Sequence, residues 1–190
     1  METNKPDPPS HPGYFLKTKR LGFRHWTQDD LGLAVDLWGD EQVMRFIDKR
    51  GSLSETQVQA RLTQEMLTQS EHGVQYWPLF LLQSHTHVGC AGLKPYDETK
   101  RIFELGFHIC TKHWRRGYAS EAAEAVIAHA FNTLSVVGLF AGHNPENQGS
   151  RDLLVRLGFR YTHDEFYEPT GMLEAAYLLL AGDFANRSKA

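Results

Sequence analysis

The segment from Ile102 to His143 constrains the fold more than any other part of the chain. Residues 102–109 form an apolar run long enough for a strand, and residues 136–143 form another. Between them, residues 119–132 have an apolar face at helical spacing, made of Ala122, Ala123, Val126, Ile127, Ala130 and Phe131. A strand, a helix and a second strand in this order usually form a right-handed parallel crossover. The sequence therefore predicts a βαβ unit.

Helices are also predicted outside this unit. Thr27 followed by Asp30 resembles a helix N-terminal cap, and apolar residues follow it at helical spacing. Ser54 and Gln57 form a capping box that begins a helix through about Ser70. The apolar face of that helix is predicted to contain Val58, Leu62, Met66 and Leu67. A further helix over about 148–157 is expected to end at Gly158, because glycine is favoured just after the last residue of a helix.

Further strands are predicted over residues 18–24, 75–83, 88–93, 159–167 and 172–180. Residues 95–100 are polar and turn-like, so the runs on either side are expected to pair as a hairpin. Residues 169–171 are expected to turn a second hairpin, and Pro78 implies an edge or a bulge in its strand. Together these runs predict an α/β (α+β mixed) fold, with a mixed sheet of about seven strands and helices on both faces.

Composition limits the cellular setting of the protein. The 190 residues, 41% of them hydrophobic, suit one globular domain. We expect a disordered, polar and proline-rich lead-in over residues 1–14 and a single domain over residues 15–185. No apolar run approaches the roughly 20 residues that cross a bilayer, and the N-terminus lacks the apolar segment of a secretory signal. The protein is therefore expected to be cytoplasmic, without membrane contact.

The charge pattern argues against nucleic acid as a partner. The formal net charge is -3 at pH 7, and no run of lysines or arginines supplies the basic face that a duplex binder needs. The one dense basic stretch, Lys112–Arg116, is short and suits a pocket for a small anion better.

The two cysteines, Cys90 and Cys110, are expected to be free thiols. In the predicted hairpin, antiparallel pairing puts Cys90 opposite roughly position 105, so that Cys110 lies too far along the partner strand to form a disulfide. Two reduced thiols suit a cytosolic protein.

The loop at residues 115–120 joins a predicted strand to the start of the central helix. A helix start offers main-chain N–H groups without partners and the positive end of the helix dipole. Gly117 has no Cβ, so a bulky anion can approach the main chain, and Ala119 and Ser120 are small. We expect this loop to bind a pyrophosphate group. The alternative for so short a motif is an ordinary connection between a strand and a helix.

The loop matches neither of two common nucleotide-binding motifs. The sequence contains no Gly-x-x-x-x-Gly-Lys-Ser/Thr, so phosphoryl transfer on a P-loop is disfavoured. No Gly-x-Gly-x-x-Gly follows a strand, so a Rossmann dinucleotide site is disfavoured as well.

The loop does resemble the cofactor motif of the GNAT N-acetyltransferase superfamily. That motif is Gln/Arg-x-x-Gly-x-Gly/Ala, and Trp114-Arg-Arg-Gly117-Tyr-Ala119 stands in its place here. Trp114 departs from the general motif and is similar to the branch that contains the ribosomal-protein alanine N-acetyltransferases. Arg115 replaces a glycine that is usual in that branch.

Other segments resemble the same family in the same order. Thr18–Arg24 is similar to its opening Thr-x-Arg-Leu strand, and Glu104-Leu-Gly-Phe107 to its Glu-Ile-Gly-Tyr strand. Asn147-Gln-Gly-Ser150, followed by Leu157-Gly-Phe159, resembles its Asn-x-x-Ser…Leu-Gly-Phe segment. The resemblance covers most of residues 16–180.

The resemblance implies a GNAT-like acyl-CoA N-acyltransferase fold with a splayed sheet, and acetyl-CoA as co-substrate. It implies acetyl transfer to a primary amine, either a protein N-terminus or a small molecule, by direct attack in a ternary complex. A non-catalytic acyl-CoA-binding sensor or partner module is the alternative, and a homodimer is compatible with the sequence. The implied cofactor-binding residues are Arg115, Arg116, Gly117, Tyr118, Ala119, Ser120, Asn147 and Ser150. Main-chain N–H groups of residues 116–120 are expected on the pyrophosphate, and Asn147 and Ser150 near the pantetheine arm.

Glu104 is the candidate catalytic base. The attacking amine must be neutral, but an alkyl amine with a pKa of about 10.4 is mostly protonated at pH 7. A general base removes that proton, and desolvation of a carboxylate within the apolar run 102–109 suits a base working near neutral pH. The alternatives are a glutamate on the exposed face of a half-buried strand, or one that fixes a neighbouring loop.

No general acid is assigned from the sequence. Many GNAT enzymes use a tyrosine in the helix after the asparagine, and Leu154 occupies the matching position here. Tyr161 and Tyr167 lie nearby in the sequence, but tyrosines in a hairpin more often pack than catalyse. Solvent or a main-chain donor is the remaining alternative.

Histidines do not indicate a metal site. His85 and His87 lie between two predicted strands and fit a hairpin turn better than a pair of metal ligands. No third ligand lies at a recognisable spacing, so no metal is expected. Other histidines, His108 and His143 among them, are scattered; His143 and Asn144 follow a strand and are weak candidates to line the site.

Overall fold

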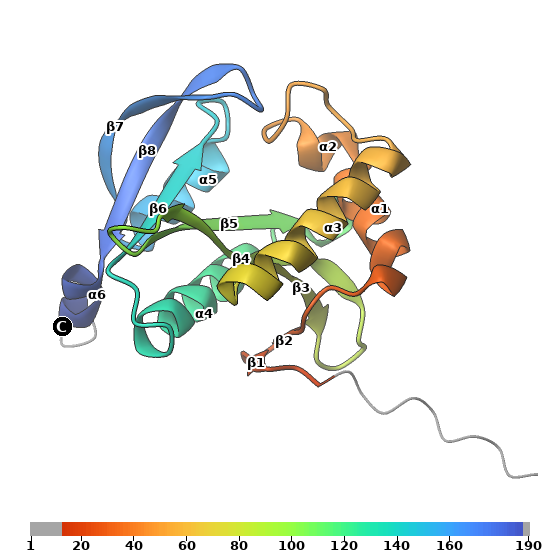
Figure 1. The fold of residues 1–190 in the computed structure, drawn as a ribbon, viewed down its shortest axis with the longest axis horizontal. Coiled ribbons are helices and arrows are strands. Elements are labelled where there is room, and N and C mark those ends of the chain that lie inside the picture. The colour runs from red at the N-terminus through yellow and green to blue at the C-terminus, as the bar shows by residue number, and fades with distance from the viewer. Residues whose placement is uncertain (1–12, 188–190) are drawn as a thin grey trace, which may run out of the picture.

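The computed structural model of the protein describes residues 13–187 (Figure 1). Its strands are β1 (Leu16–Lys17), β2 (Leu21–Phe23), β3 (Tyr76–Leu81), β4 (His87–Asp97), β5 (Ile102–Ile109), β6 (Gly138–His143), β7 (Arg160–Tyr167) and β8 (Met172–Leu180). Its helices are α1 (Leu31–Trp38), α2 (Glu41–Met44), α3 (Glu55–His72), α4 (Tyr118–Asn132), α5 (Gln148–Arg156) and α6 (Ala181–Arg187). Of the lead-in expected over residues 1–14, residues 1–12 lie outside the described part. Tyr14 is described, and its hydroxyl lies 3.0 Å from Nδ1 of His85.

One mixed sheet contains the eight strands, in the order β1-β2-β3-β4-β5-β6-β8-β7. Strands β5 and β6 are parallel, and the other neighbouring pairs are antiparallel. Helix α4 connects β5 to β6, so the predicted βαβ unit is confirmed. The closing hairpin of β7 and β8 is confirmed as well.

The sheet has one strand more than the predicted seven, because the run 18–24 is not a single strand. Residues 18–20 turn the chain, and β1 pairs back onto β2. The hydroxyl oxygen of Thr18 accepts hydrogen bonds from the main-chain N–H groups of Leu21, at 2.9 Å, and Arg20, at 3.3 Å. A threonine that binds the main chain just ahead of it stabilises a turn.

The helices form two hydrophobic cores with the sheet. The larger core joins the strands to α4 and α5, and the predicted face of α4 lies in it. The smaller core joins α1, α2 and α3 to the sheet. Its residues outside these helices include Tyr76 of β3, Cys90 of β4 and Cys110, which follows β5. The expectation of helices on both faces is therefore confirmed.

Helix α3 begins at the predicted capping box, but one of its predicted core residues is wrong. Leu67 is 46% exposed, whereas Leu62 is fully buried. Five residues separate the two, which turns Leu67 about 140° away from Leu62 at 3.6 residues per turn. Glu65 occupies the buried face instead, where its carboxylate accepts the main-chain N–H of Tyr76 at 2.8 Å and pairs with Lys94 at 3.4 Å.

The predicted register of the β4–β5 hairpin is also wrong. Cys90 lies opposite His108, not near position 105, because β4 continues through Pro95 to Asp97 and the turn comes later than expected. Both cysteines are nonetheless free and buried. Burial raises the pKa of the Cys90 thiol, and raises that of Cys110 to about 11. The two thiols are therefore protonated and unreactive at neutral pH.

Pro78 lies where the sheet tolerates it. Strand β2 ends opposite Leu79, so that Pro78 pairs only with Cys90 of β4. A bulge follows between Leu79 and Phe80. Both features agree with the expected edge or bulge, because a proline has no N–H to donate to a ladder.

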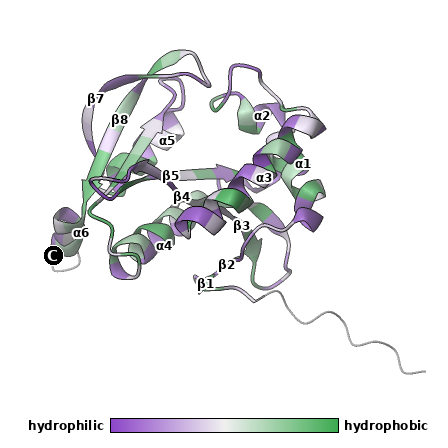
Figure 2. Cartoon of the chain, in the orientation of Figure 1, coloured by the Kyte–Doolittle hydropathy of each residue, from purple (hydrophilic) through white to green (hydrophobic). Residues whose placement is uncertain are grey.

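Strand β7 is the polar edge of the sheet. Figure 2 draws most of it as hydrophilic, and its residues are exposed apart from the partly buried Glu165. Charged residues along an edge discourage pairing with a second chain.

The contrast within α3 gives a stability test. Leu62→Ala should lower the free energy of unfolding by about 2–5 kcal/mol, because it leaves a cavity in the smaller core. The matched variant Leu67→Ala should change it by less than about 0.5 kcal/mol, since that side chain is exposed. Denaturant unfolding measures both; equal effects would contradict the orientation of α3.

Candidate functional site

A cleft of about 730 Å³ lies between β5 and β6. Figure 1 shows the two strands diverging. The two strands pair over only three positions, from Ile102 opposite Gly138 to Glu104 opposite Phe140. Beyond them β5 pairs only with β4, and β6 only with β8, so the strands diverge. Residues 105–109 and 141–144 line the two walls of the gap. A concave site of this size can enclose a small molecule.

The 115–120 loop forms one end of the cleft. Arg115 and Gly117 both have positive φ, of 59° and 77°, and Gly117 is the N-cap of α4. The first main-chain N–H of this region with a partner is that of Glu121, which donates to the carbonyl of Gly117 at 3.1 Å. Among residues 13–187, no group accepts a hydrogen bond from the main-chain N–H groups of residues 115–120, and no side chain caps the helix. Such a helix start can bind an anion.

Arginines add positive charge to this end of the cleft. Arg115 and Arg156 line it, and Nη2 of Arg156 donates to the hydroxyl of Ser120 at 3.4 Å. Arg116 does not line the cleft, and its carbonyl accepts a hydrogen bond from Nη1 of Arg20 at 2.9 Å. The loop thus combines uncapped amides with nearby guanidinium groups.

Arg20 and Glu121 hold the loop from behind. Nε of Arg20 lies 2.5 Å from a carboxylate oxygen of Glu121, and its guanidinium carbon is 4.6 Å from the ring centre of Tyr118. Thr18 donates its hydroxyl to the other oxygen of Glu121 at 2.5 Å. Burial raises the pKa of Glu121, but the hydrogen bonds from Thr18 and Arg20 outweigh it, so that this pKa lies below its usual range.

Glu104 is the last residue of β5 that pairs with β6, and it lies in the wall of the cleft. The hydroxyl of Tyr76 donates to its carboxylate at 2.7 Å. The ring of Tyr76 fills the space beside Gly106, where a Cβ would lie 2.2 Å from the ring. Burial, then the charge of Glu104 and the hydrogen bond to it, raise the pKa of Tyr76 well above its usual range. The carboxylate is therefore held in place by a permanent donor.

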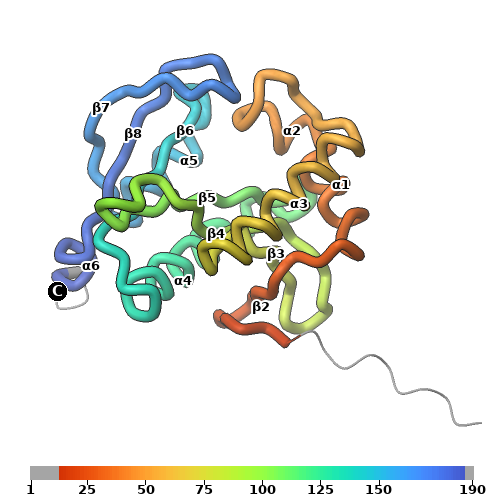
Figure 3. The backbone as a smooth tube through the Cα atoms, in the orientation of Figure 1, coloured from red at the N-terminus to blue at the C-terminus, as the bar shows by residue number. Residues whose placement is uncertain are grey.

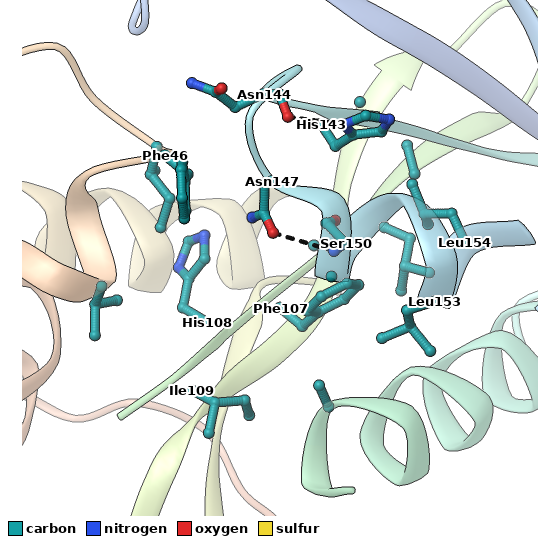
Figure 4. Close-up of a pocket in the computed structure, with 18 of the residues that line it drawn as sticks. Phe46, Phe107, His108, Ile109, His143, Asn144, Asn147, Ser150, Leu153 and Leu154 are labelled. Carbon is teal, nitrogen blue, oxygen red and sulfur yellow. Dashed lines mark hydrogen bonds between the residues drawn. The ribbon is translucent and has the colours of Figure 1, made fainter. Parts of the chain in front are cut away.

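On the other wall, the segment after β6 leads into α5 (Figure 4). Asn147 is the N-cap of α5, and its side chain accepts the main-chain N–H of Ser150 at 3.1 Å. Both residues line the cleft. The Asn147 side chain thus caps α5 and also lines this wall of the cleft.

A family model described as an acetyltransferase (GNAT) domain matches residues 20–160. The chain belongs to the GNAT acetyltransferase family. The resemblance of the loop and its flanking segments is thereby confirmed at the level of the family.

Individual proteins agree with this assignment. The chain is similar to the uncharacterized N-acetyltransferase YoaA of Bacillus subtilis (strain 168), at 27% identity over 146 residues, covering 76% of this chain and 82% of that protein. Its structure is similar to that of an acetyltransferase (GNAT family) from Bacillus anthracis, with a TM-score of 0.76, 24% identity, and 88% and 98% of the two chains covered. It is also similar to RimL, the ribosomal L7/L12 alpha-N-protein acetyltransferase, in complex with coenzyme A. There the TM-score is 0.74 at 12% identity, with 87% and 97% covered. The structural likeness confirms the GNAT fold.

The GNAT cleft brings together most of the residues singled out in the sequence. Glu104, Asn147 and Ser150 line it with the loop residues Arg115, Gly117, Tyr118, Ala119 and Ser120. Leu154 lines it as well, and it is 1% exposed and has no polar group to donate a proton. Of the two hairpin tyrosines, Tyr167 lines the cleft, whereas Tyr161 lies in a separate shallow hollow.

Two cleft histidines have their tautomers fixed by neighbours. The indole N–H of Trp38 donates to Nδ1 of His108 at 3.2 Å, so the neutral ring carries its proton on Nε2. Burial, then the charges of Arg61 and Lys94, hold the pKa of His108 well below its usual range. Nδ1 of His143 lies 2.8 Å from the carbonyl oxygen of Asn144, to which it donates (Figure 4).

Other side chains in the cleft were not predicted as site residues. Tyr76 comes from β3, and Glu165 and Glu174 from the closing hairpin. In the sequence they appear only as charged or phenolic residues within predicted strands. Such residues are common on the surface of any sheet, so they do not indicate a site. Arg20 lay inside the Thr-x-Arg-Leu resemblance, but nothing local links it to a loop nearly 100 residues away.

In residues 13–187, no cluster of three or more His, Cys, Asp or Glu side chains is arranged to hold a metal ion. His85 lies in the connection between β3 and β4 with φ 54°, as the hairpin interpretation predicts, but His87 is the first residue of β4 and is buried. Over the same residues, no helix is both long and apolar enough to cross a bilayer.

The lowered pKa of Glu121 predicts how stability depends on pH. A carboxylate with a folded pKa below its unfolded value of about 4.3 stabilises the protein above that value, and this stabilisation is lost as the pH falls through the folded pKa. Glu121→Gln should therefore lower the Tm at neutral pH, and the difference from the wild type should shrink below about pH 4. Thermal unfolding from neutral to acidic pH measures it. The exposed Glu124→Gln on the same helix is the control; an equal, pH-dependent loss there would contradict the assignment.

Proposed function

We propose that the protein transfers the acetyl group of acetyl-CoA to a primary amine by direct attack in a ternary complex. The observation that carries this proposal is the row of main-chain N–H groups at residues 115–120. They have no hydrogen-bond partner among residues 13–187 and belong to the loop that ends the cleft. Converging amides at a helix start suit a pyrophosphate group. The complex of RimL with coenzyme A supports the same class of ligand.

The residues present fit this co-substrate. In the proposal, the main-chain N–H groups of residues 116–120 hold the pyrophosphate, and the side chains of Arg115 and Arg156 add positive charge. Asn147 and Ser150 line the wall along which the pantetheine arm would lie. Bound acetyl-CoA supplies an activated thioester, and the parted strands leave room for it beside Glu104.

The chemistry asks little of the protein beyond positioning and proton transfer. The amine nitrogen attacks the thioester carbon, the new N–C bond forms, and the C–S bond breaks to release the thiolate of CoA. Glu104, oriented by Tyr76, takes the proton that the amine must lose. The thiolate then needs a proton, since a thiol has a pKa of about 8.5.

Tyr167 is the side chain we propose as that donor. Leu154 cannot serve, and Tyr161 lies outside the main cleft. Burial, and then the charge of Glu104, raise the pKa of Tyr167 to about 12, so its hydroxyl is protonated at neutral pH. Water is the alternative donor, because Tyr167 remains 36% exposed.

The cofactor site is tested with Gly117→Val. A branched side chain at this positive-φ position would stand against the bound phosphates, so the affinity for acetyl-CoA should fall at least about tenfold. Gly73→Val is the matched control, because Gly73 also has positive φ, of 72°, but ends α3 on the exposed surface. Calorimetric titration with acetyl-CoA measures both. Retained affinity in a folded Gly117→Val protein would place the cofactor elsewhere.

Catalysis is tested by release of free thiol from acetyl-CoA when primary amines are added. Glu104→Gln should lower kcat by about 10²-fold or more and flatten its dependence on pH, while acetyl-CoA still binds. Glu98→Gln, in the exposed β4–β5 turn, is the control and should leave both unchanged. An unaltered pH profile would remove Glu104 from the mechanism. Binding of acetyl-CoA without release for any amine would favour the acyl-CoA sensor.

A further inference from the structure

The acceptor side of the cleft has an unusual arrangement of acidic residues. Glu165 of β7 and Glu174 of β8 lie directly opposite each other in the antiparallel hairpin, and both line the cleft. Residues opposite each other in such a pair point to the same face, and two like charges there are destabilising. Glu104 lines the same cleft as a third carboxylate.

Among residues 13–187, no cationic side chain forms an ion pair with Glu174, although it is almost fully buried. It is 6% exposed, and one carboxylate oxygen, Oε1, accepts the hydroxyl of Thr170 at 2.7 Å. The other, Oε2, has no hydrogen-bond partner among residues 13–187 and lies beside Gly142 in the cleft wall, 3.6 Å from where a Cβ would stand. Burial and the charges of Glu104 and Glu165 raise the pKa of Glu174, against the hydrogen bond from Thr170. A buried carboxylate normally has a cationic partner.

Lys94 lies close to this region but is paired with another carboxylate. Lys94 lies opposite Glu104, but its ammonium pairs with Glu65 at 3.4 Å and lies 4.4 Å from the ring centre of Tyr76. Nε2 of His163 lies 3.2 Å from a carboxylate oxygen of Glu165, and the His163 side chain is 56% exposed. The arginines that line the cleft are at the loop end, and no lysine of residues 13–187 lines it.

Aromatic rings complete this side of the cleft. Tyr96 stacks on Phe140 with 3.9 Å between ring centres and 6° between planes, and both line the cleft. The hydroxyl of Tyr96 donates to Glu165 at 3.0 Å, which holds the ring beside the acidic pair. Aromatic faces next to carboxylates are the surroundings that bind alkylammonium groups best.

We infer that the acceptor is a diamine or polyamine, whose reacting amine meets Glu104 while a second ammonium group pairs with Glu165 and Glu174. The inference rests on the proposed function, because Glu104 is committed to the proton of the reacting nitrogen. A second positive charge on the acceptor neutralises the repulsion between the paired carboxylates and gives Glu174 the partner that it lacks. A peptide N-terminus, whose amine is followed by neutral amide groups, leaves the acidic pair unmatched.

The test uses three acceptors with the same four-carbon chain and one primary amine in common. Putrescine ends in a second ammonium, n-butylamine in a methyl group, and γ-aminobutyrate in a carboxylate. With the full-length protein, acetyl-CoA and a thiol readout, kcat/KM should be about tenfold or more higher for putrescine than for n-butylamine, and lowest for γ-aminobutyrate. Equal values for putrescine and n-butylamine, or a higher value for a peptide N-terminus, would overturn the inference and leave the acetyltransferase proposal standing.

Variants then locate the second ammonium. Glu174→Gln keeps the hydrogen bond from Thr170 but loses the charge, and should lower the ratio of kcat/KM for putrescine to that for n-butylamine about tenfold. Glu165→Gln should act in the same direction. Glu168→Gln, an exposed glutamate paired with Lys49 in the same hairpin, is the control and should leave the ratio unchanged. An unchanged ratio in both cleft variants overturns the inference, and no release with any amine overturns the proposed function with it.

Discussion

The separation of β5 from β6 after Glu104 and Phe140 is the constraint on which the site depends. Two parallel strands that stopped pairing would expose main-chain groups on both edges, and such groups are costly when they lose water without gaining a partner. Here each strand stays paired on its outer side, β5 with β4 and β6 with β8, so the sheet remains anchored while its centre opens. The main-chain groups inside the gap are then available to a ligand.

The cleft is divided by charge along its length. At one end, the uncapped start of α4 and two arginines favour an anion. At the other, three carboxylates and several aromatic rings favour a cation. The start of α4 belongs to the βαβ crossover, whereas the acidic pair Glu165 and Glu174 belongs to the closing hairpin. The two ligands of a transfer reaction can therefore be recognised by elements that fold from different parts of the chain.

Local chemistry explains what could be predicted from the sequence. The capping box of Ser54 and Gln57, the apolar stripe of α4 and the bounds of β5 depend on neighbours within a few residues, and each appears as expected. Short helices such as α2, begun by Asp40 accepting the N–H of Gln42, and α6 were missed because they contain too few residues for a periodic pattern. The loop at residues 115–120 was singled out because a helix start next to a glycine can bind an anion, and most of its residues line the cleft; its binding of a cofactor stays a prediction.

What failed depends on contacts between distant segments. The burial of Glu65 was not predicted, because its carboxylate is stabilised there by distant partners, the main-chain N–H of Tyr76 and the ammonium of Lys94. The partner of Cys90 was misjudged because the length of β4 is set by pairing, not by its own composition. The places of Arg20, Tyr76 and Glu174 could not be predicted either, because each depends on contacts with residues of other elements.

The rim of the cleft is closed by the main chain. The N–H of Lys49 donates to the carbonyl of Pro169 at 2.8 Å, which joins the segment after α2 to the β7–β8 turn, and Figure 3 draws these two segments approaching each other. This backbone hydrogen bond joins the two segments beyond the cleft lining, and the pairing of β5 with β6 joins the two walls where they begin to part. The distance between these two segments is therefore set by a main-chain contact, which a substitution of the side chains that line the cleft leaves in place.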